Sequence, residues 1–140
     1  MIVSRYADNF PGTVGGSLEI LGGPIYPAQE VLTLVQVPNG GTIKAWTRKC
    51  HDDLQKLSFD EDDLEELIKI ALTSGCFHRS ECAQSSNGPW AACDSYVFKR
   101  QEWVHHANKE MWFDYYIKFA ISKFGNLLLL VSCHLSENRR

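Results

Sequence analysis

Four polar side chains that could do chemistry lie on two strand-like runs within residues 112–135. Tyr116 and Lys118 belong to the first run, in which apolar and polar residues alternate with the period of two that is typical of a half-buried strand. Ser132 and His134 belong to the second run, which begins almost wholly apolar and then becomes mixed. Together they offer a phenol, an amine, a hydroxyl and an imidazole.

The turn between the two runs decides which of these side chains are neighbours. The sequence Phe124-Gly125-Asn126 lies between the runs and is typical of a short hairpin turn. If the turn holds these three residues, Lys123 pairs with Leu127. This register predicts that the tyrosine lies opposite the imidazole and that the lysine lies opposite the serine, all on one face of the hairpin.

Such a set suits phosphodiester chemistry. Metal-free RNA cleavage requires a base for the 2′-hydroxyl proton, an acid for the leaving 5′-oxygen and cations that stabilise the phosphorane. His134 can be acid or base near neutral pH, and Arg79 offers a permanently charged, bidentate phosphate clamp. Lys118 can supply a charge, or a base if burial lowers its pKa, while Tyr96 and Tyr116 can stack on a nucleobase or donate a proton. Each of these residues, taken singly, also has an ordinary structural explanation.

Other chemical sites have weaker support. A Ser–His hydrolase is disfavoured because the sequence contains no GxSxG motif. Adjacent strand residues face opposite ways, so we expect His105 and His106 in a loop or at a rim, without a metal.

Five cysteines, an odd number with no CxxC, indicate free and partly buried thiols. No zinc-knuckle spacing occurs among three Cys/His groupings, so we expect no metal and no cofactor; the groupings are Cys50-His51, Cys76-x-His78 and Cys133-His134.

Helices are predicted before the strands. Apolar residues at helical spacing predict a helix starting at Pro27, a second over 45–57 and a third that ends near Gly75. Ser58 and Glu61 fit a capping box for the third helix.

Strands are predicted mainly in the second half of the chain. Residues 91–99 have strand-like composition, and residues 100–110 are predicted to be a loop or a bent connection into the hairpin. Short strands are also possible over 17–21 and 42–44. Helices followed by antiparallel strands indicate the α+β class.

Length and composition are those of an ordinary globular domain. The chain has 140 residues, of which 44% are hydrophobic and 22% charged. We expect residues 1–26, rich in Gly and Pro, to be an arm or short hairpin, and residues 27–140 to form the main domain. No apolar run is long enough for a membrane helix and no signal-peptide pattern is present, so we expect a cytoplasmic protein without a membrane partner.

Charge is unevenly distributed along the chain. The formal net charge is −3, but residues 1–66 hold 11 acidic and 5 basic side chains, whereas residues 67–140 hold 6 acidic and 9 basic ones. Much of the acidity lies in residues 60–66, where the dipole of a helix N-terminus favours it. The basic second half permits an anionic ligand on the strands but does not require one.

Short motifs in a common order resemble the MqsR family of toxins over about Pro27 to His134. They are Thr47-Arg48, Leu57-Ser58-Phe59-Asp60, Phe77-His78-Arg79-Ser80, Trp90 followed by Asp94-x-Tyr96, Tyr116-Ile117-Lys118-Phe119 and Val131-Ser132. The resemblance implies a RelE/MqsR-like central antiparallel sheet with N-terminal helices packed on it. It also implies a type II toxin that cleaves mRNA at short GC-containing sequences without a metal ion, inhibits translation and growth, and is neutralised by a cognate antitoxin, MqsA-like or other.

The resemblance also implies roles for particular residues. The family's basic residue in Phe-x-Lys-Ser falls on Arg79, its sheet tyrosine on Tyr116 and its strand lysine on Lys118. The basic residue after Val-Ser falls on His134, where the family has lysine, while the glutamine beside the tryptophan has no clear match. These four are the predicted catalytic residues. The predicted substrate-binding residues are Tyr96, Ser132 and Trp90.

Two other functions are compatible with the sequence. The same basic sheet could bind RNA or a protein partner without catalysing a reaction. Alternatively, the domain could be stabilised by a metal bound to Cys76, His78, Cys82 and Cys93.

Overall fold

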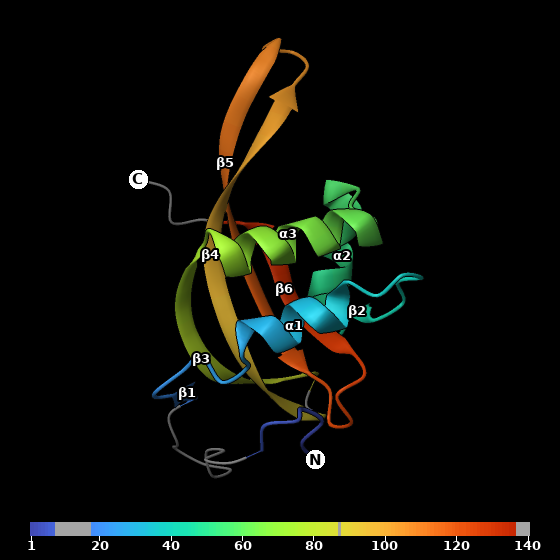
Figure 1. The fold of residues 1–140 in the computed structure, drawn as a ribbon, viewed down its shortest axis with the longest axis vertical. Coiled ribbons are helices and arrows are strands. Elements are labelled where there is room, and N and C mark those ends of the chain that lie inside the picture. The colour runs from blue at the N-terminus through green and yellow to red at the C-terminus, as the bar shows by residue number, and fades with distance from the viewer. Residues whose placement is uncertain (8–17, 87, 137–140) are drawn as a thin grey trace.

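The computed structural model describes residues 1–7, 18–86 and 88–136, which form a six-stranded sheet and three helices (Figure 1). The strand order is β1-β3-β4-β5-β6-β2, and all pairings are antiparallel except the parallel pair β2–β6. Because the helices are segregated to one face of a largely antiparallel sheet, the predicted α+β class is confirmed. The elements are β1 (Glu19–Ile20), α1 (Ala28–Val35), β2 (Ile43–Ala45), α2 (Arg48–Leu57), α3 (Glu61–Thr73), β3 (Cys76–Gln84), β4 (Trp90–Val104), β5 (Lys109–Ile121) and β6 (Leu128–Leu135).

The helix starts follow from local capping. Thr47 caps α2, because its hydroxyl accepts a hydrogen bond from the backbone N–H three residues on. Asp60 caps α3 and forms a capping box with Asp63. The predicted capping box of Ser58 and Glu61 is therefore wrong by two residues. Ser58 instead ends α2 in the left-handed conformation, with φ of 58°.

Strands β4 and β5 continue past the helices as a two-stranded ribbon, residues 100–113, which projects at the top of Figure 1. Their pairing extends to Val104 opposite Lys109, so the predicted loop over 100–110 is wrong. Only residues 105–108 form the turn, and they include both adjacent histidines, as predicted. At the base of the ribbon Phe113 packs against the main core and Arg100 lies over the ring of Phe59, whereas residues 105–112 are exposed. Because no residue of 100–113 is fully buried, the sequence lacks the apolar alternation that a buried face produces.

One face of the sheet, called here the helix face, forms the main core. Phe98 stacks on Tyr115 with ring centroids 5.5 Å apart, and Tyr96 stacks on Phe119 with centroids 5.9 Å apart. These rings are buried under apolar residues of the three helices, chiefly Val31, Val35, Cys50, Leu54, Leu64, Leu67, Ile68 and Ala71. Side chains alternate along a strand, so the neighbouring positions of β4, β5 and β6 point to the opposite face, called here the open face.

The N-terminal residues are hydrogen-bonded into the same sheet. Asp94, fully buried on β4, accepts hydrogen bonds from the backbone N–H groups of Ile25 (3.0 Å) and Tyr26 (2.9 Å) and from the hydroxyl of Ser80 (2.5 Å). Strand β1 pairs with β3, which confirms the short strand predicted over 17–21. The rest of the predicted arm or hairpin includes residues 8–17, which lie outside the described residues.

Within the described parts of the chain, none of the helices combines the length and the apolar character needed to cross a bilayer.

Candidate functional site

The predicted pairing of polar side chains across β5 and β6 is confirmed. Tyr116 lies opposite His134, and Lys118 lies opposite Ser132. All four are partly buried and lie on the open face, because the residues that alternate with them, such as Ile117, are in the core under the helices.

The turn that leads to this register differs from the prediction. The N–H of Ser122 donates to the carbonyl of Leu127 (2.9 Å), so the predicted Lys123–Leu127 pair is wrong. Lys123 instead donates its N–H to the carbonyl of Val3 (2.8 Å). The longer turn would shift every later pair by one residue. A bulge in β6 at Val131 restores the register, so the predicted pairs form for a different reason.

Tyr116 lies between two imidazoles. Its ring stacks on that of His134, with centroids 5.2 Å apart and planes at 27°. On the other side it meets the edge of His78 from β3, at 6.1 Å and 79°. Aromatic pairs at these distances are mutually favourable, so the three rings support one another as a row across the sheet.

The contacts of His134 define its tautomer. The Nδ1 atom lies 2.9 Å from the carbonyl oxygen of Leu135, and a carbonyl oxygen can only accept a hydrogen bond. The proton of the neutral ring must therefore reside on Nδ1. This leaves Nε2 as an unprotonated acceptor, which is the form that a general base requires.

A carboxylate lies beside the two predicted phosphate-binding cations. The Nζ atom of Lys118 is 2.9 Å from one oxygen of Glu81, and an Nη atom of Arg79 is 3.6 Å from the other. Burial lowers the pKa of Lys118, but the hydrogen bond to Glu81 and the electrostatic effects of Tyr116, Glu81 and Cys93 together outweigh it, and the pKa is raised. Lys118 therefore keeps its positive charge near neutral pH and is suited to bind an anion rather than to accept a proton.

Two of the predicted substrate-binding residues are not on the open face. Tyr96 is 6% exposed and packs in the main core on Phe119 and against Phe77, because its register partner is the buried Ile117. Trp90 begins β4 and packs with a small separate cluster that contains Ile20, Cys82 and Ala92. The structure therefore brings Arg79, Lys118, Tyr116, His134 and Ser132 to one face, and leaves Tyr96 and Trp90 elsewhere.

Sequence reasoning missed His78 and Glu81 as members of this surface. Glu81 follows Arg79 by two residues in one strand, so simple alternation would have placed both on the same face. His78 precedes Arg79 directly, and alternation would have placed it on the opposite face. A bulge in β3 between Phe77 and Arg79 brings it to the open face, and no residue type at that point indicates a bulge.

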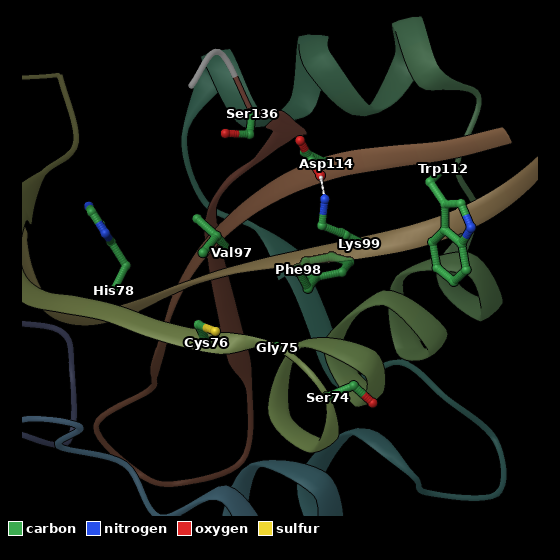
Figure 2. Close-up of a pocket in the computed structure, with 10 residues that line it drawn as sticks. All are labelled: Ser74, Gly75, Cys76, His78, Val97, Phe98, Lys99, Trp112, Asp114 and Ser136. Atoms are coloured by element: carbon green, nitrogen blue, oxygen red, sulfur yellow. Dashed lines mark ion pairs between the residues drawn. The ribbon is translucent and has the colours of Figure 1, made fainter. Parts of the chain in front are cut away.

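A hollow adjoins this row of side chains at the base of the ribbon (Figure 2). Its volume is about 640 Å³, and His78 is one of its lining residues. Figure 2 shows His78 and Trp112 at opposite ends, with the ion pair of Lys99 and Asp114 between them (3.2 Å). The hollow and the row therefore form one continuous surface that shares an imidazole.

Metal ligands are not grouped in the part of the chain that the structure describes. Residues 1–7, 18–86 and 88–136 contain no cluster of three or more His, Cys, Asp or Glu side chains arranged to hold an ion. The four ligands considered for a stabilising metal, Cys76, His78, Cys82 and Cys93, accordingly form no such cluster.

No protein-family model matches the sequence, and no curated protein and no solved structure shows significant similarity to it.

Proposed function

We propose that this protein is a metal-independent endoribonuclease of the MqsR type, the mRNA-cleaving toxin of a type II toxin–antitoxin pair acting in the cytoplasm. The observation that best supports the proposal is the row His78–Tyr116–His134 on the open face, next to the cations Lys118 and Arg79. These are the kinds of groups that metal-free cleavage needs, and a helix-covered antiparallel sheet accords with the resemblance.

In the proposed reaction the 2′-oxygen attacks the adjacent phosphorus and the bond to the 5′-oxygen breaks. His134 accepts the 2′-hydroxyl proton at Nε2, since its Nδ1 is bonded to the carbonyl of Leu135. His78, on the other side of Tyr116, gives a proton to the leaving 5′-oxygen. The products are a 2′,3′-cyclic phosphate and a 5′-hydroxyl end.

The cations stabilise the charge that builds on the phosphate. Arg79, whose side chain is 46% exposed, can bind phosphate oxygens in a bidentate manner. Lys118 is more deeply buried and supplies a fixed charge beside Tyr116. Glu81 holds both cations in place before RNA binds, and the phosphate competes with this carboxylate for them.

RNA cleavage in the presence of EDTA tests the proposal. The wild-type protein should cut a single-stranded RNA and leave 2′,3′-cyclic phosphate ends, whereas His134→Ala should be slower by roughly 100-fold or more. Tyr116→Phe keeps the ring stack and removes only the hydroxyl, so it shows whether the phenol takes part. His106→Ala, in the exposed turn of the ribbon, is the matched control and should cut normally.

The results discriminate between mechanisms. Unchanged cutting by His134→Ala would remove this residue from the mechanism, and loss of wild-type cutting in EDTA would indicate a metal-dependent route. For the toxin role, expression should arrest growth, and a small adjacent gene should encode an antitoxin that relieves the arrest.

The second candidate is a non-catalytic module that binds RNA or a protein with the same face. The specific observation in its favour is that Glu81 already pairs with both Lys118 and Arg79, so the cations of the face are partly neutralised. Harmless overexpression together with RNA binding but no cleavage would favour this candidate.

A further inference from the structure

The hollow at the base of the ribbon has the shape and chemistry of a ligand site next to the proposed catalytic row. Its volume of about 640 Å³ is in the range of small-molecule pockets. It shares His78 with the row, and Asp114 in its wall is two residues from Tyr116 on the same face of β5. A polymer bound across the row would therefore extend into this hollow.

Trp112 forms one end of the hollow and is 63% exposed (Figure 2). It lies four residues before Tyr116 on β5, which corresponds to about 13 Å along the strand. An indole ring left this exposed beside a concave surface offers a flat apolar platform, and nucleobases stack on such platforms whatever their sequence.

The middle of the hollow is polar. Lys99 and Asp114 form an ion pair there, with Nζ and Oδ1 3.2 Å apart, and the Lys99 side chain is 71% exposed. The pair presents hydrogen-bond donors and acceptors side by side in a hollow that Val97 also lines. A ligand with a flat apolar face and a polar edge would match both the platform and the ion pair.

We propose that this hollow is a nucleobase subsite, which binds one base of a single-stranded RNA that lies across the proposed catalytic row. The base stacks on Trp112, and its polar edge meets the Lys99–Asp114 pair. This inference rests on the proposed function, because it takes RNA as the polymer that crosses the row. It adds a binding site that lies outside the proposed proton-transfer and phosphate-binding groups.

The test measures binding separately from cleavage. The probe is a short, mixed-sequence 2′-O-methyl oligoribonucleotide with a fluorescent label, which cannot be cut because its 2′-oxygen is blocked. Trp112→Ala should raise its Kd by roughly fivefold or more, the loss expected for one base–aromatic stack. Trp112→Phe should retain most of the affinity, because a phenyl ring still stacks.

A matched control separates the subsite from a general effect of exposed aromatic residues. Phe124 is 89% exposed in the turn between β5 and β6, outside the hollow, and Phe124→Ala should leave Kd unchanged. Asp114→Asn should alter the relative affinity for probes that differ in one base, since it exchanges an accepting carboxylate oxygen for the donating NH2 of an amide. Far-ultraviolet circular dichroism verifies the fold of each variant.

The outcomes distinguish the subsite from the proposed function. If the wild type cuts RNA but Trp112→Ala binds the probe as tightly as the wild type does, the subsite is wrong and the ribonuclease proposal stands. That result would also follow if the hollow were a docking site for a protein. If the probe binds in a Trp112-dependent way but RNA is never cut, the subsite stands and catalysis is wrong. If the wild type neither binds nor cuts, both proposals fail.

Discussion

Lys118 and Glu81 form an ion pair that reaches over β4, with Nζ and Oε2 2.9 Å apart and both side chains largely shielded from solvent. The pair connects β5 to β3 on the open face, since Lys118 lies opposite Ser95 and Glu81 lies opposite Cys93. It keeps the lysine charged, and it places a negative charge where the proposed function requires an anion to bind. The energetic role of Glu81 is therefore the first feature to test.

Glu81→Gln should tighten RNA binding. Removal of one carboxylate charge next to the phosphate site relieves about 1 kcal/mol of repulsion, equivalent to roughly fivefold in the Kd of an uncleavable RNA. Glu66→Gln is the matched control, because it removes an equal charge that is paired with Arg100 away from the site. An equal change in both variants would mean that only the net charge of the protein matters.

His78→Ala should reduce RNA cleavage by roughly 100-fold or more while the protein stays folded. The proposed mechanism needs an acid for the leaving 5′-oxygen, and His78 is the second imidazole in contact with Tyr116. Single-turnover cleavage at saturating RNA measures the chemical step without the contribution of binding. His51→Ala, an exposed imidazole on α2, should cut at the wild-type rate. Full activity of His78→Ala would leave only an aromatic packing role for this ring.

Asp94→Asn should destabilise the fold by about 1–3 kcal/mol. The buried carboxylate accepts hydrogen bonds from the backbone of Ile25 and Tyr26 and from Ser80, and an amide would turn a donor toward at least one of these donors. Urea unfolding gives the change in free energy. Asp62→Asn, exposed in the first turn of α3, should cost less than about 1 kcal/mol. Equal costs at the two positions would contradict the anchoring role of Asp94.

One thiol of the native protein should react rapidly with Ellman's reagent, and five should react in denaturant. Cys76 is exposed and lines the hollow, whereas the other four cysteines are buried. Cys76→Ser should abolish the fast reaction. If the hollow is the nucleobase subsite, a bulky maleimide on Cys76 should also weaken RNA binding. A second rapidly reacting thiol in the native state would contradict the packing of the core.

Stability should fall as the pH rises above about 9. Burial raises the pKa of Cys133 to about 12 from the ordinary value of 9.0, so the folded state disfavours the thiolate. The contribution of the protonated Cys133 thiol to the free energy of unfolding is fully present below the pKa of this thiol in the unfolded chain. It is lost as the pH rises toward the pKa of the thiol in the folded protein. For Cys133 the loss is at most about 1.4 kcal/mol per pH unit. Burial acts in the same direction on Cys50, whose pKa it raises to about 12.

Urea unfolding at several pH values checks this slope. Cys133→Ala removes one titrating group, so its free energy of unfolding should decline less steeply with pH than that of the wild type. A stability that rises above pH 9 would show that the buried thiols are not the dominant alkaline groups.

Local patterns were sufficient to predict most of the elements. The helices follow from apolar spacing of three and four residues, strand β5 follows from alternation of period two, and β6 follows from its apolar run after a short turn. These patterns work because each reports burial of a single face of one element. The ribbon was missed because no residue of 100–113 is fully buried, so burial imposes no apolar pattern on this part of the sequence.

The membership of the candidate site depends on tertiary structure. By itself, the sequence determined the residue types available and the presence of a β5–β6 hairpin, whereas the pairing of Tyr116 with His134 depends on the bulge at Val131. Only the folded chain decided that His78 joins them and that Tyr96 does not. A bulge adds one residue to a strand and reverses the face of the next side chain, and its position depends on strand pairing between distant segments rather than on local composition.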